Sequence, residues 1–256
     1  MTQPDDRGTA RRALGLLDLT NLNDDCSEQD IDALCDRAVT EFGSVAAVCL
    51  WPRFVRHAVD RLKGTGVRVA SVANFPAGGT DTITAMAEAT SILDDGADEV
   101  DLVMPYRAYI DGRRGFAETQ IVRVREAIGD RGTLKVILET GELADPDIIR
   151  DVSEMAIGAG ADFIKTSTGK TKVSATPEAI TIMLDAIGRA DRPVGIKPSG
   201  GIRTLADAAL YLGLADGALG SGWARPESFR FGASGLLDAL TAALEGTAAP
   251  AGTASY

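Results

Sequence analysis

The sequence has very few of the residues on which two common kinds of catalytic site are built. It contains one histidine, His57, and three cysteines, Cys26, Cys35 and Cys49. A single histidine excludes the common triads built on histidine and the zinc sites that need several His or Cys ligands. His57 shares the polar face of a predicted helix with Arg53, so we expect it at the surface. An odd number of cysteines in a chain of 256 residues implies no disulfide framework.

Clustered positive charge and long apolar runs are also lacking. The chain carries 6 lysines and 20 arginines at a net charge of -11, and its basic residues form no cluster. This excludes a surface for nucleic acid or anionic membranes, since both need concentrated Lys and Arg. There is no signal-peptide pattern, and no apolar run approaches the roughly 20 residues of a membrane span. We therefore expect a cytoplasmic protein that acts on small molecules.

Short apolar runs alternate with longer segments of helical periodicity along most of the chain. The runs are mostly continuous, which is typical of parallel strands covered on both faces. Eight such strands with helices between them indicate a (β/α)8 TIM barrel. A doubly wound sheet is the alternative, but it usually has five or six strands. The predicted strands span residues 44–51, 67–75, 99–105, 133–140, 162–168, 193–198, 217–222 and 229–234.

The chain shows no linker or change of composition within residues 10–246, which we interpret as one domain. We expect a short helical extension before the barrel and a disordered N-terminus over residues 1–9. Residues 247–256 are small and contain proline and glycine, so they predict a flexible tail. Ser27, Thr176 and Thr204 are each expected to cap a helix.

Two of the few lysines stand where an apolar strand ends. Lys165 lies in "DFIKTSTGK" and Lys197 in "VGIKPSGG". In barrels of this kind the reactive groups lie at the carboxyl ends of the strands. The two lysines fall on the fifth and sixth predicted strands, which are neighbours. Lys135 comes earlier in the fourth predicted strand, and we interpret it as structural, paired with Glu139.

Two adjacent, desolvated lysines suit Schiff-base chemistry. An unperturbed lysine has a pKa of about 10.4, so roughly one in 2,500 is neutral at pH 7. Only the neutral amine attacks a carbonyl. An apolar wall and a second ammonium group both lower the pKa. One lysine would then be the nucleophile and the other a persistent cation.

Asp101 places a carboxylate inside the apolar strand of "DEVDLVMPYR". Such a group is costly unless it is paired. It is either a structural ion pair with a barrel lysine or a proton shuttle that also orients the second lysine. Two lysines at the same barrel mouth favour the functional role. Asp98 and Glu99 precede the apolar run and are interpreted as loop residues.

Three turns with glycine follow predicted strands five, six and eight: "TGK" at 168–170, "SGGIR" at 199–203 and "GASG" at 232–235. Glycine allows backbone N–H groups to close on an anion, and a helix N-terminus favours negative charge. Lys170 and Arg203 add positive charge. Any one turn is explained by turn geometry alone, but the three together indicate a phosphate site.

These motifs resemble those of the deoxyribose-phosphate aldolases, which are class I aldolases on a (β/α)8 barrel. The similarity runs from "LGLLDLTNLNDD" at 14–25 to "FRFGAS" at 229–234, and the pair "FIKTSTGK" and "KPSGG" is specific to the family. The resemblance implies reversible cleavage of 2-deoxy-D-ribose 5-phosphate into acetaldehyde and D-glyceraldehyde 3-phosphate. It further implies that no metal or other cofactor takes part, and that the chain forms a homodimer.

Carried over by position, the resemblance implies that Lys165 forms the Schiff base while Asp101 and Lys197 handle protons. It implies a tail tyrosine, Tyr256, that assists carbon protonation; the alternative is an incidental tyrosine in a disordered tail. Asp18, Thr20 and Asn23 look like residues of the substrate pocket, and they equally fit the end and cap of an N-terminal helix. The phosphate contacts implied are Gly169, Lys170, Gly200, Gly201, Arg203, Gly232 and Ser234.

Two residues depart from the pattern of the family. Gly235 stands where a second serine is expected, which removes one hydroxyl from the phosphate site. Ser199 replaces an alanine, and we expect it to restore a donor in part. Cys49 is interpreted as a core residue near enough to the pocket to react with aldehydes.

Other functions stay open at this point. One is a class I or transaldolase-like enzyme with a different carbonyl donor. Another is a phosphosugar isomerase or synthase without a Schiff base, in which Asp101 is the base and Lys197 the electrophile. The last is a phosphosugar-binding protein without catalysis, which the two strand-end lysines argue against.

Overall fold

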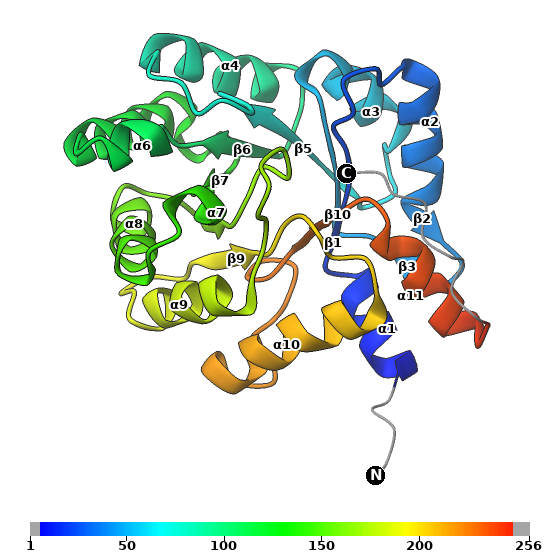
Figure 1. The fold of residues 1–256 in the computed structure, drawn as a ribbon. Coiled ribbons are helices and arrows are strands. Elements are labelled where there is room, and N and C mark those ends of the chain that lie inside the picture. Colours follow the sequence, from blue (N-terminus) through cyan, green and yellow to red (C-terminus); the bar gives the residue numbers. More distant parts are fainter. Residues whose placement is uncertain (1–5, 248–256) are drawn as a thin grey trace.

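In the computed structural model, which describes residues 6–247, eight parallel strands form one curved sheet (Figure 1). Parallel bridges from Ile196 to Phe229 and from Ser199 to Gly232 join its two outer strands, so the sheet closes on itself. The predicted (β/α)8 barrel is confirmed. In spatial order the strands are β10 (Phe231–Ala233), β1 (Leu17–Asn21), β4 (Ala47–Leu50), β5 (Arg68–Ala73), β6 (Glu99–Val103), β7 (Thr133–Ile137), β8 (Phe163–Lys165) and β9 (Gly195–Lys197).

Helices connect successive strands and cover the outside of the barrel (Figure 1). This arrangement buries both faces of the strands, which is why most of them are continuous apolar runs. A hairpin of β2 (Val39–Thr40) and β3 (Gly43–Ser44) precedes β4. The α-helices are α1 (Asp6–Leu14), α2 (Glu28–Arg37), α3 (Val55–Arg61), α4 (Thr82–Asp94), α5 (Tyr106–Ile110), α6 (Arg114–Ile128), α7 (Thr140–Leu143), α8 (Pro146–Gly158), α9 (Pro177–Gly188), α10 (Leu205–Leu219) and α11 (Leu236–Glu245), with short 3-10 helices at Pro52–Phe54 and Gly129–Arg131.

The strand predicted at 217–222 is wrong. Thr204 and Asp207 form a capping box that starts α10, and this helix continues to Leu219 before Gly220 ends it at a φ of 97°. The other predicted strands are present but shorter. The barrel reaches eight strands through β1, so Lys165 and Lys197 lie on its sixth and seventh strands, not the fifth and sixth. They remain neighbours, paired in register.

β1 was not among the predicted strands, and its residues had an alternative interpretation as a helix end. The helix ends at Leu14, three residues before the strand begins. Leu17 and Leu19 belong to the main apolar core, whereas Asp18 points into the barrel toward Lys197. This alternation with a period of two is the signature of a strand. The helix-end interpretation of Asp18 and Thr20 is therefore wrong.

The helical extension at the N-terminus is present as α1. It begins at Asp6, so the prediction of disorder over residues 1–9 is wrong for residues 6–9. Ala10, Ala13 and Leu14 are buried, and both Nη atoms of Arg12 lie 2.6 Å from Asp216 on α10. Except for Thr247, the predicted tail at 247–256, with Tyr256, lies outside the described residues.

Within residues 6–247, no helix is both long enough and apolar enough to cross a membrane.

Candidate active site

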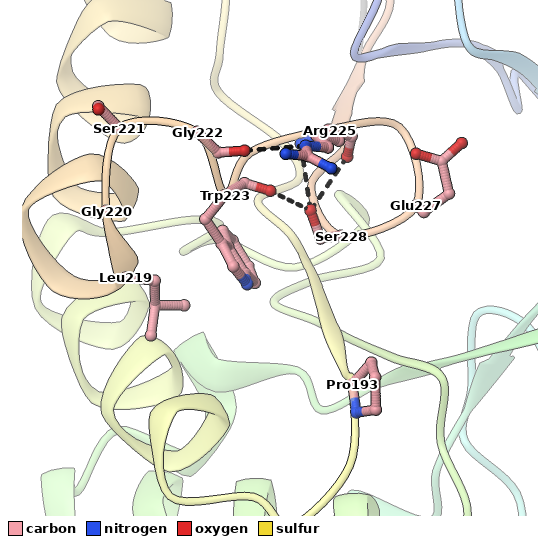
Figure 2. Close-up of a pocket in the computed structure, with 9 residues that line it drawn as sticks. All are labelled: Pro193, Leu219, Gly220, Ser221, Gly222, Trp223, Arg225, Glu227 and Ser228. Carbon is pink, nitrogen blue, oxygen red and sulfur yellow. Dashed lines mark hydrogen bonds between the residues drawn. The ribbon is translucent and has the colours of Figure 1, made fainter.

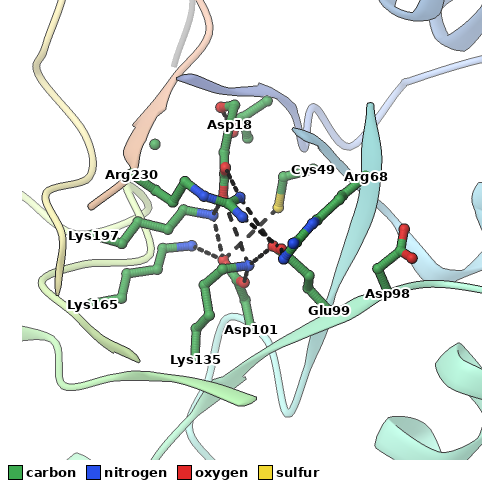
Figure 3. Close-up of polar contacts among 12 residues, drawn as sticks. Asp18, Cys49, Arg68, Asp98, Glu99, Asp101, Lys135, Lys165, Lys197 and Arg230 are labelled. Carbon is green, nitrogen blue, oxygen red and sulfur yellow. Dashed lines mark hydrogen bonds and ion pairs between the residues drawn. The ribbon is translucent and has the colours of Figure 1, made fainter. Parts of the chain in front are cut away.

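A network of charged side chains fills the inside of the barrel (Figure 3). All of its central members are buried. Inward-facing positions on neighbouring strands bring them together, since Asp101 pairs in register with Lys135, and Lys165 with Lys197. The network joins three carboxylates to four cations: Asp18 on β1, Glu99 and Asp101 on β6, Lys135 on β7, Lys165 on β8, Lys197 on β9, and Arg230 just before β10.

Lys165 lies at the carboxyl end of β8, and its side chain is 3% exposed. Its Nζ is 2.7 Å from Oδ2 of Asp101. Burial lowers the pKa of Lys165 below its ordinary value, and the neighbouring ammonium of Lys197 lowers it further. The Asp101 carboxylate opposes this shift without cancelling it. The amine of Lys165 is therefore the one most readily available in its neutral, nucleophilic form.

Lys197 has the opposite electrostatic surroundings. Its Nζ lies 2.7 Å from Oδ2 of Asp101 and 2.5 Å from Oδ2 of Asp18. Burial alone would lower the pKa of Lys197, but these two carboxylates outweigh burial and hold the pKa well above its ordinary value. The pKa values of the two adjacent lysines are therefore shifted in opposite directions.

The number of charges in the network leads to the same assignment. Without Lys165, its three carboxylates are matched by three cations, Lys135, Lys197 and Arg230. Lys165 would be a fourth buried cation that shares Asp101 with Lys135 and Lys197, and such an excess of buried charge is costly in a medium of low dielectric constant. Arg68 also reaches Glu99, but its side chain is 41% exposed and water can solvate its charge. The network is neutral when the amine of Lys165 is neutral.

At the end of the network around Lys135 and Glu99, the structure corrects two predictions from the sequence. Lys135 pairs with Glu99 and with Oδ1 of Asp101 at 2.9 Å, not with Glu139 as predicted. Glu99 is not a loop residue, because it lies on β6 and is fully buried. Arg230 bridges Oδ1 of Asp18 at 2.6 Å and Oε1 of Glu99 at 2.7 Å. Burial would raise the pKa values of Asp18, Glu99 and Asp101, but the surrounding cations lower them, chiefly Lys197 for Asp18 and Lys135 for the other two.

The three glycine turns converge beside these lysines. A Cβ on Gly200 would lie 2.5 Å from Ser174 Oγ and 3.5 Å from the Cα of Gly169, so the turns after β8 and β9 meet. A Cβ on Gly232 would lie 3.1 Å from Cε of Lys197. Gly169, Gly200 and Gly201 have φ between 77° and 81°, a region that favours glycine. The turns thus form one surface at the carboxyl end of the barrel.

Hydrogen bonds within this surface engage some of the expected donors. The N–H of Gly200 donates to the oxygen of Gly232 at 3.2 Å, and the N–H of Gly232 donates to Pro198 at 2.8 Å. Ser199 Oγ donates to Gly232 O at 3.4 Å, so the donor expected at Ser199 is directed to the backbone. These glycines allow close approach of the turns, and the N–H groups of Gly200 and Gly232 already donate to backbone oxygens.

Comparison with known proteins identifies the family. The model of the DeoC/LacD family aldolases matches residues 12–240. The chain belongs to this aldolase family. It is 52% identical over 241 residues to the deoxyribose-phosphate aldolase of Agrobacterium fabrum, covering 94% of this chain and 93% of that one.

Solved structures agree with this family assignment. A candidate deoxyribose-phosphate aldolase from Coccidioides immitis is 32% identical, with a TM-score of 0.82 over 91% of this chain and 85% of that one. One from Toxoplasma gondii is 27% identical, with a TM-score of 0.85 over 94% of this chain and 95% of that one. The likeness extends over nearly the whole barrel.

In this DeoC/LacD family aldolase, the predicted pocket residues of the N-terminal segment separate into two groups. Asp18 contacts Lys197, and Thr20 is buried beside it with Oγ1 donating to the oxygen of Asp18 at 2.9 Å. Asn23 lies beyond the end of β1, where its backbone oxygen accepts a hydrogen bond from Trp51 Nε1 at 2.9 Å. The structure thus joins Asp18 to the charged network. Thr20 contacts the backbone of Asp18, and Asn23 contacts Trp51.

The rim of the barrel carries the remaining predicted residues. Lys170 and Arg203 are exposed, and Nζ of Lys170 is 3.4 Å from Asp24. Ser234 follows β10 and is half-buried, and Gly235 precedes α11.

Cys49 is buried on β4 with Sγ 4.0 Å from Asp101 Oδ2, and burial raises its pKa. His57 is half-buried, and its Nε2 is 2.8 Å from Asp32.

The sequence analysis missed Arg230 and the network role of Glu99. Arg230 stands between two buried aromatic residues in "FRF", and an arginine at that place in a strand signals a buried ion pair. Glu99 and Asp101 are two residues apart, so a strand that includes both must direct both to one face. These signals were available in the sequence.

The other end of the barrel has a hollow of about 670 Å3 that contains none of the predicted site residues (Figure 2). Its walls are the loop between α10 and β10, including Trp223 and Arg225, together with Pro193. Both segments precede a strand of the parallel barrel, so the hollow lies at the amino ends of the strands. Lys165 and Lys197 lie at the carboxyl ends. The hollow is thus separate from the charged network.

Proposed function

We propose that the protein is a deoxyribose-phosphate aldolase that cleaves 2-deoxy-D-ribose 5-phosphate through a Schiff base on Lys165. The observation that carries the proposal is the excess of cations over carboxylates in the buried network, in which Lys165 shares Asp101 with Lys135 and Lys197. The name of the Agrobacterium fabrum relative supports the choice of substrate.

The chemistry follows from a neutral amine at the mouth of the barrel. The amine of Lys165 attacks the C1 aldehyde, and loss of water from the adduct gives an iminium ion, which accepts electrons from the bond to be broken. Removal of the proton on the C3 hydroxyl makes C3 a carbonyl and breaks the C2–C3 bond. The electron pair of that bond forms an enamine on Lys165, and D-glyceraldehyde 3-phosphate leaves. Protonation of the enamine carbon and hydrolysis release acetaldehyde.

Asp101 and Lys197 would move the protons. Oδ2 of Asp101 lies 2.7 Å from Nζ of Lys165 and 2.7 Å from Nζ of Lys197. One carboxylate oxygen therefore contacts both amines, and a proton can pass between them through hydrogen bonds. Lys197 keeps its charge and so disfavours a second ammonium on Lys165. Every step uses groups of the chain and water, without a metal ion.

The substrate's phosphate would bind at the three turns. Gly169 and Gly201 have positive φ, Lys170 and Arg203 supply positive charge at the rim, and Ser234 supplies a hydroxyl group. Gly200 and Gly232 contribute by allowing the turns to approach one another. Thr20 and Asn23 would line the path of the sugar from the side of β1.

The test is borohydride reduction in the presence of acetaldehyde, followed by intact mass and peptide mapping. We expect a reduced two-carbon adduct on Lys165 that is absent from a folded Lys165→Ala variant. Turnover of 2-deoxy-D-ribose 5-phosphate would then be measured on the same samples. A folded wild-type protein that binds the phosphosugar without trapping acetaldehyde would contradict the proposal and favour an isomerase or a binding protein.

A further inference from the structure

One buried carboxylate lies outside the charged network. Glu139 follows β7 and is fully buried, yet its hydrogen bonds are to threonines instead of lysines. Its Oε2 accepts from Thr168 Oγ1 at 2.6 Å, and its Oε1 accepts from Thr171 Oγ1 at 3.1 Å. The N–H of Thr168 lies 3.3 Å from both carboxylate oxygens. Both oxygens therefore receive donors from the segment that follows Lys165.

These bonds continue into the turn that carries Lys170. The hydroxyl of Thr168 donates to Glu139 and accepts the N–H of Lys170 at 3.0 Å. Between them Gly169 adopts a φ of 79°. A hydroxyl that both donates and accepts has its proton direction fixed, which makes each bond depend on the other. Glu139 thereby constrains the backbone from Thr168 to Lys170.

The two segments also pack closely. Gly141 lies against the chain at Val173, where an added Cβ would stand 2.2 Å from the Val173 oxygen. The N–H of Thr140 donates to the oxygen of Thr166 at 2.9 Å. Glu139 itself has a φ of 59°, which is costly for a residue with a Cβ. The conformation that costs this free energy is the one that directs the carboxylate at the turn.

We infer that Glu139 is a positioning residue that holds the turn from Thr168 to Thr171 in the conformation that binds the substrate's phosphate. This inference rests on the proposed function. Glu139 acts through Thr168 and Thr171 and does not itself touch substrate. Its loss should therefore weaken binding of a phosphorylated substrate and leave the bond-breaking chemistry at Lys165 intact.

The test compares 2-deoxy-D-ribose 5-phosphate with 2-deoxy-D-ribose as substrates of four variants. For Glu139→Ala we expect the KM of the phosphorylated sugar to rise about tenfold, with kcat and the KM of the free sugar changed less than about twofold. Glu142→Ala, which removes an exposed glutamate from the short helix α7 that begins directly after Glu139, is the matched control and should behave as wild type.

Two further variants separate positioning from bulk stability. Glu139→Gln keeps one side-chain oxygen that can accept from Thr168, and its new NH2 group can donate to Thr171 Oγ1. The Thr171 hydroxyl can then donate to the backbone oxygen of Val173, which lies 3.2 Å away. It should restore KM to within about threefold of wild type. Thr171→Val removes one of the hydrogen bonds and leaves no cavity, so we expect a rise of about threefold in KM for the phosphorylated sugar alone.

Several outcomes would overturn the inference. They are equal losses on both sugars, a fall in kcat with KM unchanged, a Glu139→Gln variant as impaired as Glu139→Ala, or no change in both Glu139→Ala and Thr171→Val. If Glu139→Ala does not fold, the KM values of Thr171→Val for the two sugars test the inference instead. Borohydride trapping with acetaldehyde needs no phosphate, so it reports on the Schiff base independently of Glu139.

Discussion

The buried charge network has two ends that use the same residue type in different ways. At one end Lys135 contacts the carboxylates of Glu99 and Asp101 and lies 3.7 Å from Asp18. At the other end Lys165 contacts Asp101 alone among the carboxylates of the described residues. Both lysines are buried on strands of the same barrel. Burial therefore does not decide their protonation, and the number of carboxylates around each amine does.

The pKa values of Lys135 and Lys165 are shifted in opposite directions. Burial lowers the pKa of both amines, but the carboxylates around Lys135 outweigh burial and raise its pKa, whereas Lys165 remains below its ordinary value. Lys135 has the surroundings of a structural cation, and Lys165 has those of a nucleophile. Four substitutions would test this comparison.

The largest effect is expected from Lys165→Ala. Without this amine no iminium ion can form to accept the electrons of the broken bond. Turnover should therefore fall at least about 10^4-fold, which corresponds to an increase of about 5.5 kcal/mol in the activation free energy. The remaining network stays balanced, so the free energy of unfolding should not decrease. Steady-state kinetics and denaturant unfolding measure the two quantities. A large loss of stability would show that the Lys165 ammonium balances a carboxylate.

Lys135→Met should chiefly affect stability. Removing this cation leaves Glu99 and Asp101 with less positive charge in a buried site, so the free energy of unfolding should fall by about 3 kcal/mol. Urea unfolding at neutral pH measures the change. An unchanged midpoint would mean that the two ends of the network are equivalent in stability.

Lys197→Met should change the pH dependence of the reaction. With one cation removed, protonated Lys165 becomes the cation that balances the network, so its pKa should rise. Less neutral amine is then present at pH 7, and kcat/KM should fall about 10^2-fold there. The rising limb of the profile of kcat/KM against pH should move to higher pH. A limb that does not move would contradict the role of Lys197 as the persistent cation.

Arg68→Met should have the smallest effect. Arg68 reaches Oε1 of Glu99 at 3.2 Å, but its side chain is 41% exposed, so water already screens the pair. We expect a loss of less than about 1 kcal/mol in the free energy of unfolding and no change in kcat/KM. A loss as large as that of Lys135→Met would show that the balance of charge must include Arg68.

The sequence predicted the main features of this site because its signals are local. A lysine at the end of an apolar run, followed by hydroxyls and glycine, marks the carboxyl end of a barrel strand at both Lys165 and Lys197. The caps at Ser27, Thr176 and Thr204 also formed as predicted, because a cap depends on residues within one turn. The false strand at 217–222 arose where a small-residue helix end and a glycine turn resemble a short strand.

The sequence by itself determined the alternation of strands and helices, the two lysines at strand ends and the glycine turns, since each depends on a few consecutive residues. Only the tertiary structure decided which charges meet. Asp18 and Arg230 are 212 positions apart in the chain and 2.6 Å apart in the barrel, and Lys135 pairs with Glu99 instead of the nearer Glu139. Closure of the barrel places these side chains in one buried space, and there burial and the nearby ammonium of Lys197 lower the pKa of Lys165.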